Sequence, residues 1–85
     1  MRKLTQEQKS RLVCVLNERL NDNTVRGIAS LVGCSFGYIS EIANGKRRYI
    51  TENNALFICR GLGINPYYVL KGSEPKYYKW EDAFS

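Results

Sequence analysis

The sequence predicts an all-α fold of five short helices. A chain of 85 residues is expected to form one domain with a modest core, which helices with local contacts build more easily than a large sheet. Apolar residues recur at helical spacing between residues that cap or end helices. No segment shows the sustained alternation of apolar and polar residues that is typical of paired strands.

The first helix is expected to begin after Thr5, because Thr5 and Gln8 have the spacing of a capping box. Leucines then repeat every four residues along one face, at Leu12, Leu16 and Leu20. The polar run from Asn21 to Asn23 ends this helix.

The next four helices are each predicted to lie between a capping residue and a glycine. The predicted caps are Thr24, Ser35, Thr51 and Asn65, and the glycines are Gly33, Gly45, Gly63 and Gly72. Pro66 stands at the first position of the fifth helix, where its missing N–H is tolerated. Residues 1–72 are therefore expected to form the domain, with 73–85 as a short tail.

The tail is rich in aromatic residues, namely Tyr77, Tyr78, Trp80 and Phe84. Four aromatic side chains are too apolar for a fully solvated terminus. We expect the tail to pack on its own domain or on a second subunit.

Composition narrows the classes of function. The net charge of +5 favours a polyanionic partner. The three cysteines, Cys14, Cys34 and Cys59, are far apart and the chain has no histidine, so we expect neither a metal site nor any cofactor. Because the number of cysteines is odd, we expect reduced thiols, and therefore a cytoplasmic protein. Their expected role is to fill small apolar spaces. The polar amino terminus and the short apolar runs predict no signal peptide and no membrane span.

Residues 24–48 predict two short helices that cross steeply at a turn. Ala29 is small enough for the close crossing, and Gly33 tolerates the positive φ that the turn needs. On the second helix, Ile39 and Ile42 are expected to face the core. The opposite stripe suits insertion into a DNA major groove, and its residues are the expected base contacts: Phe36, Gly37, Ser40, Glu41 and Asn44.

A cluster of three basic residues follows this helix, where the phosphates beside a groove would run. The expected phosphate contacts are Thr24, Arg26, Ser35, Tyr38, Lys46, Arg47 and Arg48. Two residues have an alternative interpretation. Phe36 could instead cover the core at a helix end, and Tyr38 could pack between helices.

With these residues the chain resembles the Cro/repressor-type (XRE) helix-turn-helix proteins of phages, plasmids and bacteria. The matching residues are Thr24, Ile28-Ala29, Gly33-Cys34-Ser35, Ile39-Ser40-Glu41-Ile42, Gly45-Lys46-Arg47, Leu62-Gly63-Ile64 and Asn65-Pro66. The resemblance implies a lambda-repressor-like domain, usually dimeric on two-fold operators, that controls transcription. Family members often have Gln and Glu where this chain has Val25 and Gly27.

The sequence therefore predicts two alternative functions. The first is sequence-specific binding of double-stranded DNA by a homodimeric repressor or Cro-like regulator, with dimer contacts expected at Tyr67, Tyr68, Val69, Trp80 and Phe84. The second is binding to another protein, as an anti-repressor does, because the outer stripe lacks the Arg, Gln and Lys that usually read bases. Because no catalytic residues are grouped along the chain, we expect that the protein is not an enzyme and has no small-molecule substrate.

Overall fold

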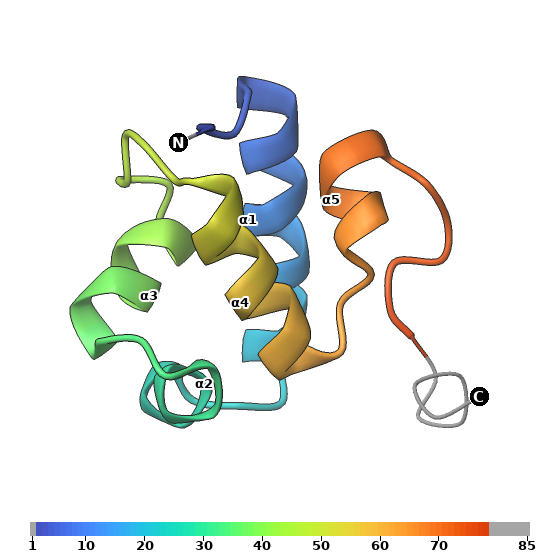
Figure 1. Ribbon diagram of the computed structural model, residues 1–85. Helices are drawn as coiled ribbons and strands as arrows, with labels where there is room; N and C mark the ends of the chain where they lie inside the picture. The colour runs from blue at the N-terminus through green and yellow to red at the C-terminus, as the bar shows by residue number, and fades with distance from the viewer. Residues whose placement is uncertain (1, 79–85) are drawn as a thin grey trace.

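The computed structural model describes residues 2–78 and has five helices within that range (Figure 1). They are α1 (Gln6–Leu20), α2 (Val25–Val32), α3 (Phe36–Ala43), α4 (Glu52–Leu62) and α5 (Pro66–Lys71). The only extended pairings among the described residues are two isolated bridges, Lys3 with Thr51 and Ile64 with Tyr77. The all-α prediction is confirmed.

Local capping sets the helix ends, as the sequence predicts. Thr5 and Gln8 form the complete capping box of α1. The other predicted caps each accept a hydrogen bond from a backbone N–H in the first turn of α2, α3, α4 or α5, and they are Thr24, Ser35, Thr51 and Asn65. Gly33, Gly63 and Gly72 end three of the helices with the positive φ that glycine adopts without strain.

The core lies where α1 meets the other helices. Helix α1 contacts α3 and α5, while α2 contacts both α3 and α4. In Figure 1, α4 passes in front of α1, and α3 and α5 lie on opposite sides of this pair. The largest fully buried side chains are aliphatic: Leu12, Leu16, Ile28, Ile39, Ile42, Ile50, Ile58 and Ile64. None of the helices within residues 2–78 is long and apolar enough to cross a lipid bilayer.

The first part of the tail packs on its own domain. The buried side chain of Asn65 donates from Nδ2 to the carbonyl oxygen of Pro75 at 2.8 Å. The Tyr77 hydroxyl donates to Glu18 on α1 at 2.6 Å, and the Arg19 guanidinium lies 4.0 Å from the centre of the Tyr77 ring. The hydrogen bond from Tyr77 lowers the pKa of the Glu18 carboxyl below its usual value. The described residues 73–78 therefore pack on their own domain, which is one of the two alternatives expected for the tail.

Two sequence predictions are wrong. Val69 is buried in the core, so it is not available as a dimer contact. Cys14 is exposed on α1 and fills no space inside, whereas Cys59 is buried as expected. Burial raises the pKa of the Cys59 thiol to about 11.

The close approach of α2 and α4 depends on Gly61, a residue that no local sequence pattern marks. A Cβ atom at Gly61 would lie 2.7 Å from Cγ1 of Val32 and 3.1 Å from its Cα. Because one of these atoms belongs to the backbone of α2, a rotamer change cannot remove the clash. The missing side chain thus allows α4 to lie directly against the end of α2.

Gly61→Ala is expected to lower the free energy of unfolding by about 1–3 kcal/mol, since the added methyl group forces α2 and α4 apart. Urea unfolding followed by circular dichroism measures the change. Gly37→Ala is the matched control, because no atom lies within 4 Å of its Cβ position. It should leave stability equal or raise it by up to about 1 kcal/mol. Equal losses in both variants would contradict the proposed packing constraint.

Candidate nucleic-acid interface

Helix α3 is anchored by its inner face. Ile39 and Ile42 are fully buried, as predicted, and Ser35 caps the helix by accepting a hydrogen bond from the N–H of Tyr38 at 3.2 Å. Since the turn before it is fixed by Gly33, with φ of 73°, α3 can present only its opposite face to solvent.

The outer face of α3 is open. Phe36 is 51% exposed; Gly37, Glu41 and Asn44 are also exposed, and Ser40 is half-buried. With an exposed ring, Phe36 does not cover the core. No atom lies near the Cβ position of Gly37, so another molecule could approach the α3 backbone closely there.

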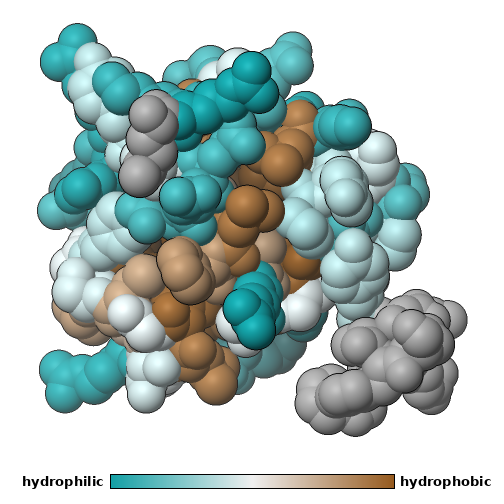
Figure 2. Space-filling model, viewed as in Figure 1, coloured by the Kyte–Doolittle hydropathy of each residue, from teal (hydrophilic) through white to brown (hydrophobic). Residues whose placement is uncertain are grey.

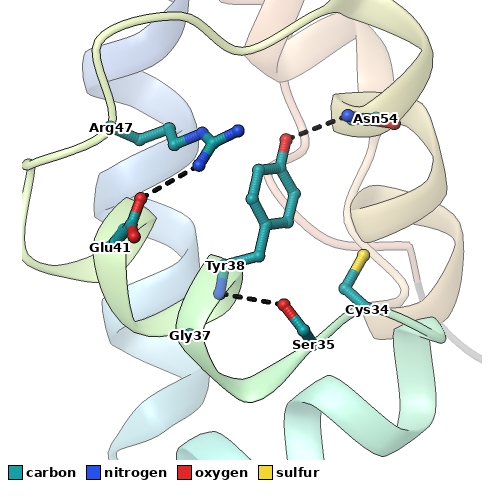
Figure 3. A pocket seen from close by; sticks show the side chains of 7 residues that line it. All are labelled: Cys34, Ser35, Gly37, Tyr38, Glu41, Arg47 and Asn54. Atoms are coloured by element: carbon teal, nitrogen blue, oxygen red, sulfur yellow. Dashed lines mark hydrogen bonds and ion pairs between the residues drawn. The ribbon is translucent and has the colours of Figure 1, made fainter.

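The basic residues Lys46, Arg47 and Arg48 are exposed directly after α3. Arg47 folds back toward the outer face, and its Nη1 lies 3.0 Å from Oε2 of Glu41 (Figure 3). Its guanidinium also lies 4.7 Å from the centre of the Tyr38 ring. One cation is thus held at the rim of the α3 face, and it offsets the negative charge of Glu41.

A second cation lies near the other end of that face. Arg26, exposed in the first turn of α2, has its guanidinium 5.8 Å from the centre of the Phe36 ring. Thr24, just before it, uses its hydroxyl oxygen to cap α2 and accepts from the N–H of Gly27 at 2.9 Å. Arg26 and Phe36 therefore lie side by side on one part of this surface, and Arg47 lies beside Tyr38 and Glu41 on another.

Tyr38 takes the packing role that the sequence leaves open, and the contact of its hydroxyl with a phosphate stays a prediction. Its half-buried ring packs against the core, and its hydroxyl oxygen accepts a hydrogen bond from Nδ2 of Asn54 on α4 at 3.0 Å. The hydroxyl proton remains free to donate to an acceptor outside. Figure 3 shows the hydroxyl aimed at Asn54 in an open polar cleft, which is lined by Cys34, Ser35, Gly37, Tyr38, Glu41, Arg47 and Asn54.

Helix α1 positions this surface through two polar side chains that sequence reasoning missed. The Lys9 ammonium donates to the carbonyl oxygens of Arg47 and Arg48 at 3.5 and 3.2 Å. Asn17 donates from Nδ2 to the carbonyl oxygen of Ala43 at 3.0 Å, at the last residue of α3. These contacts join residues far apart in the chain, and no local pattern signals them.

The residues predicted to form a dimer lie elsewhere. Tyr67 on α5 is 56% exposed and Tyr68 is half-buried, whereas Trp80 and Phe84 lie outside the described residues. Figure 1 shows α5 on the side of the molecule away from α3. A contact made by α5 would therefore leave the outer face of α3 uncovered.

Within residues 2–78, no group of three or more His, Cys, Asp or Glu side chains could hold a metal ion. No protein-family model matches the chain, and neither a curated protein nor a solved structure shows significant similarity to it.

Proposed function

We propose that this protein binds double-stranded DNA with α3 in the major groove and regulates transcription in the cytoplasm. The main support is the open outer face of α3 with a cation near each end, Arg26 on one side and Arg47 on the other. A helix fits the major groove, and phosphates run along both of its edges. The resemblance to Cro/repressor-type proteins supports the same assignment.

The chemistry of the α3 face indicates how bases would be read. Asn44 carries an amide that can both donate and accept, and Phe36 can contact the methyl group of thymine. Glu41 can accept from the amino group of cytosine. Because Arg47 offsets its charge in the free protein, Glu41 repels the phosphates less than an isolated carboxylate would.

We further propose that the protein acts as a homodimer on two-fold sites. One domain presents few phosphate contacts, and a second copy doubles them. Tyr67 and its neighbour Tyr68 are the described residues that we assign to the dimer contact, because α5 lies away from α3.

A second candidate function is binding to another protein through the same face. The exposed ring of Phe36 favours it, since aromatic side chains are enriched in protein interfaces. The Arg47–Glu41 ion pair also favours protein binding, because Arg47 would have to leave Glu41 in order to contact a phosphate. A gel-shift series on duplexes of random sequence at low salt separates the two functions.

We expect that series to show DNA binding that weakens steeply with salt. If each subunit uses about three cations, the slope of log K against log salt is about −5 for a dimer, because bound phosphates release their counterions. Absence of binding at low salt would exclude the DNA-binding function and leave the protein-binding one.

Arg48→Ala is expected to weaken binding to all duplexes alike and to make the salt slope shallower by about one per subunit. Arg48 suits this test better than Arg47, whose removal would also release Glu41. Asn44→Ala should instead change the preference between duplexes selected from a random pool.

Arg60→Ala removes an exposed cation from α4, outside both the α3 surface and the assigned dimer contact, and is the matched control. It should leave both the affinity and the salt slope unchanged. If Arg60→Ala lowers the affinity as much as Arg48→Ala, binding depends on overall charge and not on the α3 surface.

A further inference from the structure

An apolar surface on the outward sides of α2 and α4 has no role in the proposed function. It consists of Leu31, Leu56 and Phe57, which are 63%, 38% and 59% exposed. We call these three residues the α2/α4 apolar face. In Figure 2 the hydrophobic colour spreads over α4 and down to α2 on the side facing the viewer. Contiguous exposed apolar side chains of this kind usually mark a contact surface.

Arg60 joins two shallow hollows on this surface. One is lined by Asn53, Leu56, Phe57 and Arg60, which recur at helical spacing along α4. The other includes Leu31 and Arg60 together with Tyr78. Arg60 makes no ion pair with any residue between 2 and 78. The surface therefore pairs apolar side chains with a cation that an acidic partner would complement.

The described chain reaches residue 78 at the edge of this surface. The N–H of Tyr78 donates to the carbonyl oxygen of Gly63 at 3.0 Å, immediately after α4. The Asn65 and Tyr77 contacts hold the preceding residues against the domain. Tyr78 thus lies beside Leu31 and Arg60, so the chain that follows it needs no spacer to reach them.

The sequence of residues 79–85 matches the surface in chemistry and in length. Trp80 and Phe84 are four positions apart, the spacing of neighbours on one side of a helical turn, and Glu81 and Asp82 stand between them. Residues 79–85 extend at most about 25 Å. Leu56 lies only one turn, about 6 Å, from Arg60 along α4.

We propose that residues 79–85 bind the α2/α4 apolar face of their own chain. Trp80 and Phe84 pack against Leu31 and Phe57, and Glu81 and Asp82 lie near Arg60. Attachment at the edge of the surface favours the same chain over a second copy, because a short tether gives an effective concentration in the millimolar range. The proposal is independent of DNA binding, and it gives Trp80 and Phe84 an intramolecular role instead of the predicted dimer contact.

Tryptophan fluorescence of residues 1–85 tests the proposal directly, since Trp80 is the only tryptophan in the sequence. Trp80 should emit at shorter wavelength, and be better protected from iodide quenching, in the folded chain than in urea. Phe57→Ser should weaken docking about tenfold, because much of one aromatic contact is lost. In the Phe57→Ser variant, the emission of Trp80 should shift toward that of the unfolded chain, while circular dichroism shows that the helices remain.

Tyr49→Ser is the matched control, because Tyr49 is about as exposed as Phe57 but lies in the loop after α3. It should leave Trp80 emission and quenching unchanged. Arg60→Gln should reduce the protection of Trp80 partly, and added salt should do the same in the unmodified chain.

Two results would overturn the proposal. In the first, Trp80 of the folded chain is quenched as readily as in urea. In the second, its protection appears only at concentrations where light scattering detects a dimer, which would make a second copy the occupant.

Discussion

The fixed orientation of α3 is the constraint on which the rest of the structure depends. Ile39 and Ile42 are fully buried, and the left-handed conformation of Gly33 sets the direction in which α3 leaves α2. Exposing either isoleucine would remove roughly 1.5–3 kcal/mol of hydrophobic stabilisation, a large share of what a small domain has. Helix α3 therefore cannot rotate about its axis, and its outer face stays toward solvent.

Helix α1 acts as the common support for the segments around it. Lys9 holds the backbone of the basic loop, Asn17 holds the end of α3, and Glu18 accepts from Tyr77 in the tail. These polar contacts lie along the surface of a helix whose inner face supplies Leu12, Val15 and Leu16 to the core. The candidate DNA surface and the tail are thus both fastened to one rigid element.

Features governed by neighbours in sequence could be predicted, and features governed by distant contacts could not. Thr5, Ser35 and Gly33 act within one helical turn, so spacing alone locates the helix ends. The burial of Val69 depends on which side of the short helix α5 meets α1, and its six residues carry too little periodicity to show this. The contact of Gly61 with Val32 is likewise invisible in sequence, because it joins helices that are not consecutive.

We propose that the α3 face and the basic loop after it bind a DNA duplex together. Backbone amide chemical shifts, recorded while duplex DNA is added to the protein, test this claim most directly. The proposal predicts that the largest changes fall in residues 36–48 and in the first turn of α2 around Arg26, with small changes in α5. Changes confined to α4 and α5, with α3 unaffected, would contradict it.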